Sequence, residues 1–412
     1  MKRKIEVSPF LKDLALIIGR VAPLYIVGGY IRNSIMGIRC DDVDIASPIK
    51  PDMLIKLLNG SDYQIIPVNQ KLGTLLVGRG NEKYEFTSFR IDSYPLSSGI
   101  HKPDEIEFTS NIELDAARRD FTVNSIYYDI VKEEIIDVFG GVNDIENKIL
   151  RTTVNPSRVF SEDGLRIMRL IRFAAELDYT IEADTYSYAR ENVKLLSDIA
   201  GERINIELTK ILNADSKYNL NPHAHYNGVK LLKDIGALQM LLGKIPNQCI
   251  EILKHTESSI RLIALLYKYT KDINVIEEKL NNLKFKKADI KRNIRLLTLL
   301  RSKYKTDKDS LINLIIDNKD IINDFVALLS AINSKKTVIY KDAIITLLNE
   351  IRDYNLPSTL SELTVNGNDL IELDVLIKQR AEILRELLIY AITNRLNNRD
   401  ALLKVLKEKR YD

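Results

Sequence analysis

Turn-forming residues are concentrated in roughly the first third of this 412-residue chain. Eleven of its 17 glycines and seven of its 11 prolines precede residue 151. Because both residues interrupt regular elements, their density predicts short strands and helices joined by many turns. After residue 155, apolar residues recur at helical spacing with few interruptions. This division predicts an α/β head followed by a long all-helical body and tail.

Hydrophobic periodicity places the individual elements of the head. The predicted strands cover 24–27, 43–46, 63–67, 73–78, 83–89 and 126–131. The predicted helices cover 10–20, 31–36 and 113–125. Further along, turns at 221–222 and 243–246 separate helices, and Pro357 marks a boundary before the last helical segment.

Neither the cysteines nor the N-terminus indicates a secreted or membrane protein. Cys40 and Cys249 lie far apart, so they form no disulfide framework and no zinc-binding spacing. The apolar stretch after the initial MKRK is broken by Lys12, Asp13 and Arg20, which prevents a secretory signal core. No apolar run approaches membrane-spanning length. We therefore expect a cytoplasmic protein without membrane contacts.

Net charge gives little information, but its local distribution gives more. The formal charge of +3 is too small to indicate nucleic-acid binding. Residues 284–308, however, contain ten lysines and arginines against two aspartates. Such a cluster is typical of contact with a phosphate backbone, and it is equally compatible with a solvated helix face.

A glycine pair follows the first predicted strand of the head. Gly28 and Gly29 come directly after the apolar run 24–27, and Arg32 follows three residues later. Glycines can turn tightly and expose backbone N–H groups, which creates a concave site for an anion. Taken alone, a Gly-Gly pair is more often an ordinary turn.

A pair of carboxylates follows in the next predicted strand. Asp42 and Asp44 flank Val43, and alternate side chains of a strand point to the same face. Their repulsion is relieved by a divalent metal, and Mg²⁺ takes one or two carboxylates plus substrate phosphates. Combined with the glycine pair, the two aspartates supply the minimum for metal-assisted phosphoryl transfer. Glu85, in the alternating strand 84–90, is a candidate third ligand or an ordinary exposed glutamate.

Two later segments combine arginines with polar side chains. In RRDFTVN at 118–124, Asp120 and Asn124 would share one face of the predicted helix, and arginine donors suit phosphate. The alternative for this segment is an ion-paired helix cap. In EDGLRIMRLIR at 162–172, Asp163 and Arg166 are predicted helix neighbours that could bind the edge of a base.

The second segment continues as a row of cations. Arg166, Arg169 and Arg172 repeat every three residues, which makes Arg169 a further candidate for substrate contact. The alternative is a set of surface ion pairs worth little energy. His223 and His225 form an H-x-H without a further ligand at metal spacing, so we interpret them as ordinary residues.

In this order, the four segments resemble the class II tRNA nucleotidyltransferase family. That family includes CCA-adding enzymes, CC- and A-adding enzymes and bacterial poly(A) polymerases. The resemblance spans about residues 20–240, with a weaker echo in LTVNGNDL at 363–370. It implies a nucleotidyltransferase head with a mixed sheet and a helical remainder. The implied divisions are the catalytic head at 1–150, a nucleotide-selecting neck at 151–215, a body at 216–350 and a tRNA-binding tail at 351–412.

The resemblance implies roles for residues of the head. Asp42 and Asp44 match the metal-binding catalytic pair of the family, and Glu85 falls where the family places a third carboxylate. Mg²⁺ is the implied cofactor. DVFGG at 137–141 matches the hinge-like segment that precedes the neck, and GERINIEL at 201–208 matches a helix-stabilising motif of the neck.

The implied substrate contacts fall in three motifs. Gly28, Gly29 and Arg32 match the triphosphate-binding stretch, although the family usually has Asp where this chain has Asn33. That difference weakens any charged supporting role for the position.

The other two motifs bind the nucleoside. Arg119, Asp120 and Asn124 fall in the motif associated with the ribose and nucleotide. Asp163 and Arg166 match the protein template that selects CTP or ATP through hydrogen bonds to the base.

Two stretches distinguish members of the family. The loop 91–104 is full length, and in the family it governs the switch from CTP to ATP. Its end reads His101-Lys102-Pro103 where relatives usually carry an Arg-Arg-Pro-like sequence. The stretch NQKLGTLLVG at 69–78 resembles the CCA-adding side of the family.

The expected activity is template-independent addition of C, C and A to the 3′ end of tRNA from CTP and ATP, with release of pyrophosphate. An A-adding-only enzyme and a poly(A) polymerase remain open alternatives. An inactive RNA-binding protein of the same fold is a third. Intact Asp42, Asp44, Asp163 and Arg166 argue against this last alternative, because a binding module has no need of a metal pair.

Overall fold

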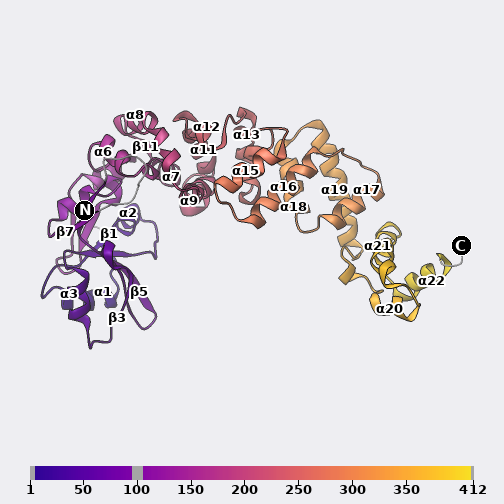
Figure 1. The fold of residues 1–412 in the computed structure, drawn as a ribbon, viewed down its shortest axis with the longest axis horizontal. Helices are drawn as coiled ribbons and strands as arrows, with labels where there is room; N and C mark the ends of the chain where they lie inside the picture. Colours follow the sequence, from indigo (N-terminus) through magenta and orange to yellow (C-terminus); the bar gives the residue numbers. More distant parts are fainter. Residues whose placement is uncertain (1–4, 95–104, 410–412) are drawn as a thin grey trace. The chain divides into compact units, whose positions relative to one another are not determined.

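The computed structural model describes residues 5–94 and 105–409. The chain divides into two compact units, one of residues 1–244 with 282–284 and the other of residues 245–281 with 285–412. Among the described residues, no helix has the length and apolar character needed to cross a bilayer. Strands belong to the first unit, and the second unit is built from helices (Figure 1).

A seven-stranded mixed sheet forms the centre of the head, as the resemblance implied. Its strand order is β3-β4-β5-β2-β1-β8-β9. Only β2 and β5 run parallel, and every other neighbouring pair is antiparallel. The strands are β1 (Tyr25–Val27), β2 (Asp44–Ser47), β3 (Gln64–Asn69), β4 (Thr74–Arg79), β5 (Glu82–Ser88), β8 (Ile126–Asp129) and β9 (Glu134–Asp137).

All six predicted strands are confirmed, and five short strands escaped prediction. They are β9 of the main sheet and two small pairs, β6 (Arg90–Ser93) with β7 (Glu105–Phe108) and β10 (Ile149–Leu150) with β11 (Thr180–Ile181). These strands are two to four residues long, too short to show an alternating pattern. Of the predicted loop 91–104, residues 91–93 belong to β6, and 95–104 with His101-Lys102-Pro103 lie outside the described residues.

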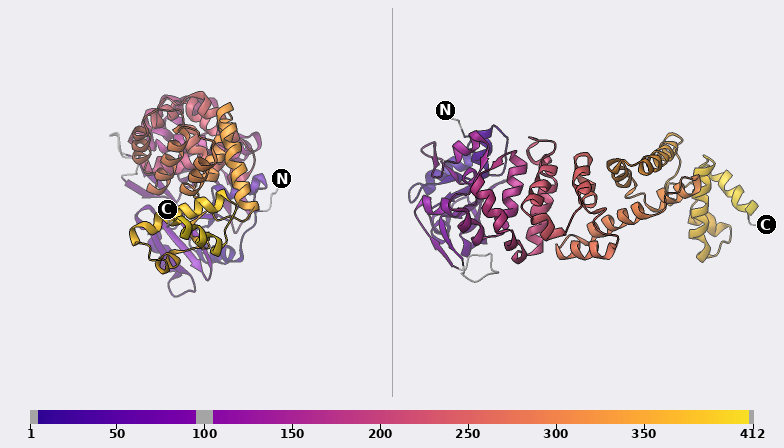
Figure 2. Two further views of the ribbon diagram at one scale, coloured as in Figure 1. Left: turned by 90° about the vertical axis from the view of Figure 1, so that its right-hand side faces the viewer. Right: turned by 90° about the horizontal axis from the view of Figure 1, so that it is seen from above.

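Helices surround the sheet and continue beyond it within the first unit (Figures 1 and 2). Those of the head are α1 (Pro9–Ile18), α2 (Gly29–Met36), α3 (Pro51–Leu58), α4 (Ile112–Ala117) and α5 (Gly141–Asn147). Those that follow are α6 (Pro156–Glu162), α7 (Leu165–Leu177), α8 (Ala183–Glu191), α9 (Gly201–Leu212), α10 (Ala214–Tyr218), α11 (Ala224–Asp234) and α12 (Ala237–Leu242).

The helix predicted over 113–125 is wrong in its second half. Helix α4 ends at Ala117, and residues Thr122–Asn124 form a separate 3₁₀ turn, η2. Between them, Phe121 is extended and fully buried, and its ring packs edge-on against Phe173 at 5.9 Å between centroids. Burial of this ring outweighs helix propensity, which amounts to less than about 1 kcal/mol per residue.

An aromatic cluster supports the part of the sheet that leads to the site. Tyr25 on β1 stacks on Phe89 at 5.6 Å, and Tyr127 on β8 meets both rings edge-on at 6.0 and 5.7 Å. The Tyr127 hydroxyl donates to Oδ2 of the fully buried Asp115 at 2.5 Å. The apolar core of the head therefore ends in a buried carboxylate.

Helix α7 is the central helix of the region that follows the head. It packs against α9, α10 and α11, and twelve of its 13 residues are buried. Apolar residues alone do not account for this burial, because Arg166, Arg172 and Glu176 are each 5–8% exposed. Buried charged side chains need partners or a ligand, so this helix points to a functional role.

The regular elements of the second unit are all helices in its described residues, and the unit runs from pink-red through orange to yellow in Figure 2. They are α13 (Asn247–Glu251), α14 (Arg261–Leu266), α15 (Ile273–Asn282), α16 (Lys287–Arg301), α17 (Lys308–Asp317), α18 (Ile322–Ile332), α19 (Lys335–Asp353), α20 (Gly367–Glu372), α21 (Ile377–Thr393) and α22 (Arg399–Lys409). Most of the basic segment 284–308 lies on α16.

Candidate active site

One cavity of about 740 Å³ in the first unit brings together almost all the predicted site residues. Eleven of the twelve line it: Gly28, Gly29, Arg32, Asp42, Asp44, Arg119, Asp120, Asn124, Asp163, Arg166 and Arg169. They come from α2, the start of β2, the segment after α4, and α7. The predicted segments, up to about 140 residues apart in sequence, thus form one site. Only Glu85 is absent from the lining.

The glycine pair turns β1 into α2 at the cavity wall. Gly28 has φ +79° and ψ −136°, a conformation that strains any residue with a Cβ. Gly29 is the first residue of α2, whose first N–H groups have no partner within the helix. These groups and the positive end of the helix dipole favour an anion at this wall.

The paired aspartates both line the cavity, although only one belongs to a strand. β2 begins at Asp44, so Asp42 lies in the loop before it rather than in the strand as predicted. The Asp44 side chain is exposed at the open cavity. Partial desolvation by the surrounding protein raises the pKa of Asp44 to about 6, the charges of Asp42 and Glu85 raise it as well, and Arg119 acts in the opposite direction.

Crowded negative charge of this kind fits a cation. Carboxylate oxygens are the ligands that hard divalent metals take, and a bound metal would relieve the repulsion around Asp44. Within residues 5–94 and 105–409, no group of three or more His, Cys, Asp and Glu is arranged to hold a metal ion. Glu85 is the exposed register partner of Asp44 on the neighbouring β5, so its role as a third ligand stays a prediction.

A buried ionic network fixes Arg119 at the cavity. Asp115 accepts hydrogen bonds from Arg118 Nε at 2.8 Å and Arg119 Nη2 at 3.3 Å, besides the Tyr127 hydroxyl. Burial alone would raise the pKa of Asp115, but the two arginines and the tyrosine outweigh it and the pKa is lowered. These bonds hold the Arg119 guanidinium beside Gly28, in a fixed position from which it can bind a phosphate.

Arg32, Asn124, Asp120 and Arg169 form a continuous chain of hydrogen bonds. Arg32 donates to Oδ1 of Asn124, the Asn124 amide donates to Asp120 at 3.3 Å, and Arg169 Nε donates to Asp120 at 2.8 Å. Asp120 and Asn124 therefore meet as predicted, but through the η2 turn and not on one helix. Their polar atoms mainly hold the two arginines at the cavity wall.

Asp163 and Arg166 line the same cavity, but the prediction that they neighbour each other on one helix is wrong. Asp163 is extended, between α6 and α7, and caps the N–H of Leu165 at 3.0 Å. Its ion-pair partner is Arg203 on α9, at 2.7 Å. Arg166 instead pairs with Glu162 at 3.0 Å.

Arg166 is further fixed by backbone contacts. Its guanidinium donates to the carbonyl of Val159 at 3.1 Å and to that of Arg118 at 2.7 Å. The Asp163 carboxylate and the Arg166 guanidinium, the acceptor and donors that could bind a base, are thus held in place by different partners. Arg203 belongs to the segment 201–208 that was interpreted only as helix-stabilising.

Several residues of the cavity wall were not predicted. Tyr94 follows β6, and its pKa is raised to about 12, chiefly by burial, so its hydroxyl stays protonated. Phe173 and Glu176 continue the lining along α7, four residues after Arg169 and Arg172, so helical i,i+4 spacing could have indicated them. Lys217 and Tyr218 on α10 also contribute, and no sequence signal marked them.

Paired carboxylates, an anion-binding turn and fixed arginines around one cavity are an arrangement that suits metal-assisted nucleotidyl transfer. Two family models match the chain, "Poly A polymerase head domain" over residues 24–151 and "Probable RNA and SrmB- binding site of polymerase A" over 178–249. The CCA-adding enzyme of Staphylococcus epidermidis is 30% identical over 372 residues, which cover 89% of this chain and 87% of that protein. The chain belongs to the family of CCA-adding enzymes.

Other relatives match over the N-terminal part or in fold. The CCA-adding enzyme of Ligilactobacillus salivarius is 38% identical over 188 residues, 46% of this chain, and the match spans about half (45%) of that relative's length. The Bacillus stearothermophilus CCA-adding enzyme in complex with CTP has the same fold, with a TM-score of 0.75, 23% identity and coverage of 98% and 99% of the two chains. The Thermotoga maritima CCA-adding enzyme complexed with tRNA_CCA gives a TM-score of 0.70, 19% identity and coverage of 98% and 96%.

Proposed function

We propose that this protein completes the 3′ CCA end of tRNA, adding C, C and A from CTP and ATP and releasing pyrophosphate. The observation that carries the proposal is the single cavity that joins Asp42 and Asp44 to Asp163 and Arg166. The first pair suits nucleotidyl transfer and the second pair suits selection of a base. Relatives named as CCA-adding enzymes, including a solved complex with CTP and one with tRNA_CCA, support the same substrates.

The transfer itself joins the 3′ oxygen of the primer to the α-phosphate and breaks the bond to the leaving pyrophosphate. Asp42 and Asp44 would hold Mg²⁺, which supplies charge neutralisation and lowers the pKa of the attacking hydroxyl. The N–H groups of Gly29 and of the next residues of α2 bind the triphosphate, whereas the N–H of Gly28 donates to the carbonyl of Ile126 at 3.2 Å. Arg119, fixed by its ionic network, orients the phosphates, so that positioning accounts for much of the rate.

Base selection rests on the fixed acceptor and donor. Asp163 retains lone pairs after it binds Arg203 and the Leu165 N–H, and Arg166 retains N–H groups after its three bonds. Cytosine and adenine each place an exocyclic amine beside a ring nitrogen acceptor, which suits this carboxylate and this guanidinium. Uracil and guanine present a carbonyl where the amine should be, and leave the carboxylate facing an acceptor.

The helical remainder would bind tRNA by shape and backbone rather than by sequence. The proposed divisions are the head at 1–150, the neck at 151–215, the body at 216–350 and the tail at 351–412. A cytoplasmic location belongs to the same proposal, because the reaction consumes nucleoside triphosphates and a tRNA still in processing.

One assay tests the proposal against its alternatives. The purified protein is supplied with Mg²⁺ and with tRNA transcripts that end before CCA or after CC, and with CTP and ATP separately and together. Addition of three nucleotides and no more when both are present supports CCA addition. Extension only of the transcript ending in CC identifies an A-adding enzyme, and long A tails on an unrelated RNA identify a poly(A) polymerase. Binding without incorporation of any nucleotide would contradict all three enzymatic assignments.

A further inference from the structure

A buried carboxylate lies in the cavity wall without a partner. Glu176 on α7 is 5% exposed and lines the cavity. Over residues 5–94 and 105–409 it makes no hydrogen bond and no ion pair, in contrast to Glu162 and Glu207 nearby, which pair with arginines. A buried charge without a partner costs several kcal/mol unless its surroundings compensate it. The reason for keeping this carboxylate therefore lies in the charges around the cavity.

Those charges are mostly positive. Burial raises the pKa of Glu176 first, and Glu207 on α9 raises it further, while Arg172 on α7, Arg32 on α2 and Lys217 on α10 lower it. Three further elements packed against α7 carry charged or titratable groups. They are α6 with Glu162, which pairs with Arg166 at 3.0 Å, the 3₁₀ turn Val193–Asp198 with Lys194 and Asp198, and α11 with His225, which lies 3.5 Å from Asp215. The pKa of Glu176 is raised overall, so the three cations offset its burial only in part, and they do so without direct bonds to its carboxyl.

Two of the three cations have no carboxylate bonded to them. Arg32 donates only to neutral acceptors, to Asn33 Oδ1 at 2.9 Å, to the Tyr218 hydroxyl at 2.9 Å and to Asn124. Lys217 makes no ion pair within the described part of the chain, whereas Arg172 pairs with Glu207 at 3.0 Å. Arg32 and Lys217 line the same cavity as Glu176, and the charges of both act on its carboxyl.

These cations lie at the phosphate end of the site. Arg32 Nη2 is 3.5 Å from the position of a Cβ on Gly29, the residue whose N–H begins α2. A triphosphate bound at the glycine pair would enter the field of Arg32 and Lys217 and neutralise it. Glu176 would remain buried, but the positive charges of Arg32 and Lys217 would no longer offset its negative charge, and the bound triphosphate would repel it.

We propose that Glu176 is the counter-charge of the nucleotide site, ionised beside Arg32 and Lys217 in the free enzyme and protonated when a nucleoside triphosphate binds. The inference rests on the proposed function and adds a residue to its nucleotide site. On binding, the Glu176 carboxyl takes up at most one proton from solvent for each nucleotide, and it returns that proton to solvent when pyrophosphate leaves. Because the bound state holds more protons, nucleotide binding strengthens as pH falls.

The test measures the protons directly. Binding of CTP with saturating Mg²⁺, without tRNA so that no turnover occurs, is followed by calorimetry in buffers of different ionisation enthalpy at pH 7.5. The wild type is expected to take up a fraction of a proton per CTP that Glu176→Gln does not take up. Between pH 6.5 and 8.5 the wild-type Kd for CTP should rise several-fold more than that of Glu176→Gln. Subtraction of the two proteins removes the protons that belong to CTP, to Mg²⁺ and to the aspartates.

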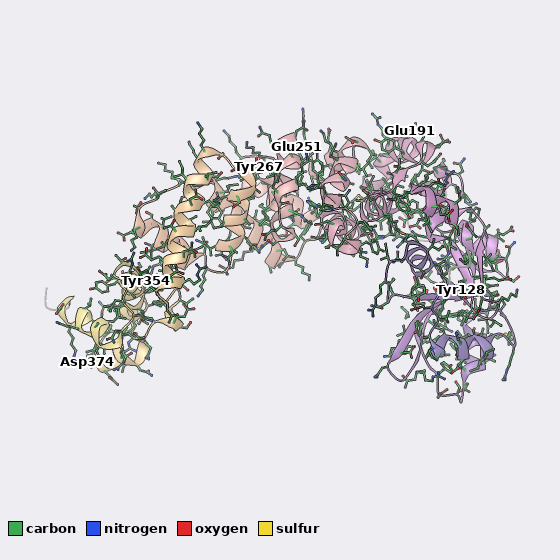
Figure 3. All side chains as sticks on the ribbon, turned by 180° about the vertical axis from the view of Figure 1, so that it is seen from behind. Tyr128, Glu191, Glu251, Tyr267, Tyr354 and Asp374 are labelled. Carbon is green, nitrogen blue, oxygen red and sulfur yellow. The ribbon has the colours of Figure 1, made fainter. Side chains whose placement is uncertain are left out.

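A matched control and a second variant keep the test decisive. Glu191, at the exposed end of α8 (Figure 3), is outside the cavity, so Glu191→Gln should take up protons like the wild type. If a thermal-unfolding measurement shows that Glu176→Gln is not folded, Lys217→Met serves instead. Loss of this cation leaves Glu176 less ionised before CTP binds and should therefore reduce the proton uptake.

Each outcome has a separate meaning. Equal proton uptake by the wild type and Glu176→Gln overturns the inference. So does a uniform loss of CTP affinity in Glu176→Gln at every pH, which would show that Glu176 accepts a hydrogen bond from the nucleotide. Failure of the wild type to bind CTP at all contradicts the proposed function instead.

Discussion

Two helices of this protein, α7 and α16, carry rows of arginines and use them differently. On α7, Arg169 and Arg172 line the cavity while they pair with Asp120 and Glu207, which come from other elements of the same unit. On α16, Arg295 pairs with Asp320 at 2.6 Å, away from any site that we describe. Both rows are ion-paired, so pairing itself does not distinguish a binding site from a structural contact.

The difference lies in what surrounds the pairs. The α7 pairs hold guanidinium groups around a concave space, where a ligand can displace water and meet several donors at once. The α16 pairs join that helix to the first turn of α18 and to the residues just before it: Arg292 Nε donates to Asp324 on α18 at 3.2 Å, and Arg295 pairs with Asp320. Because the α16 arginines are held in these ion pairs, the cations of this region that can contact a polyanion are its unpaired lysines.

The cations of the basic segment 284–308 fall into two groups, those with a bonded partner and those without an ion pair. Arg292 and Arg295 are paired, Arg301 donates to the carbonyl of Lys271 at 2.8 Å, and Lys308 pairs with Glu350 at 3.0 Å. The other six cations are exposed and have no ion pair within the described residues: Lys284, Lys286, Lys287, Lys291, Lys303 and Lys305. The count of ten positive charges in the sequence therefore overstates the charge available to bind phosphate.

The largest expected effect is on catalysis, which should depend on the first unit far more than tRNA binding does. Asp42→Ala or Asp44→Ala should lower nucleotide incorporation by about a thousandfold or more, because the metal site contributes several kcal/mol to transition-state stabilisation. Chelation of the metal from the wild type should reproduce this loss. Binding of tRNA, measured by filter retention, should change less than about threefold. Near-normal turnover of either variant with Mg²⁺ would remove these residues from the catalytic machinery.

The next effect concerns which nucleotide is added. Asp163→Ala and Arg166→Ala should each lower the rates with CTP and ATP by about ten- to a hundredfold and relax discrimination against UTP and GTP, since an unpaired buried polar group costs about 1–3 kcal/mol. Incorporation of the four nucleotides is measured separately for each protein. Arg295→Met, from the other arginine row, is the control and should leave selectivity unchanged. Selectivity that stays at the wild-type level in both Ala variants contradicts the template role.

The sequence predicted the members of the site better than their contacts. Alternation and turn residues identified β1, β2 and the glycine turn, because those signals depend on residues close together in the chain. Arg203 as the partner of Asp163 could not be predicted, since 40 residues and two helices separate them. Arg166 and Asp163 stand three residues apart, and this spacing predicted that they neighbour each other on one helix. The prediction was wrong because Asp163 lies in the break between α6 and α7.

The fold showed the same limit. The transition from the mixed sheet to helices was predictable from the distribution of glycine and proline, whereas the end of α4 at Ala117 depends on Phe121 packing against Phe173. That contact joins elements about 50 residues apart. Lys217 was missed for the same reason, because only the packing of α10 against α7 brings it to the cavity.

A smaller effect should appear in tRNA affinity. Replacement of Lys286, Lys287 and Lys291 by Gln should weaken tRNA binding by about tenfold and reduce its salt dependence by up to about 0.9 in slope for each phosphate that is no longer neutralised. Nucleotide choice should not change, because phosphate contacts position the RNA without reading it. Affinity is measured from 50 to 300 mM salt, about the range over which binding to phosphates weakens steeply. An unchanged slope would show that these lysines form only a solvated face.

The smallest effect tests the arginines of the same helix. The side chains of Arg295 and Asp320 are 34% and 64% exposed, so solvent screens their attraction and the pair should contribute less than about 1 kcal/mol. Arg295→Met should therefore lower the unfolding temperature by at most about 2–4 °C, with tRNA affinity and its salt slope unchanged. Asp320→Asn should have a similar effect, and the double variant should be no less stable than the worse single variant. A salt slope that falls in Arg295→Met as it does in the lysine variant would place this arginine among the tRNA contacts, and the distinction between the two helices would then rest on α7 alone.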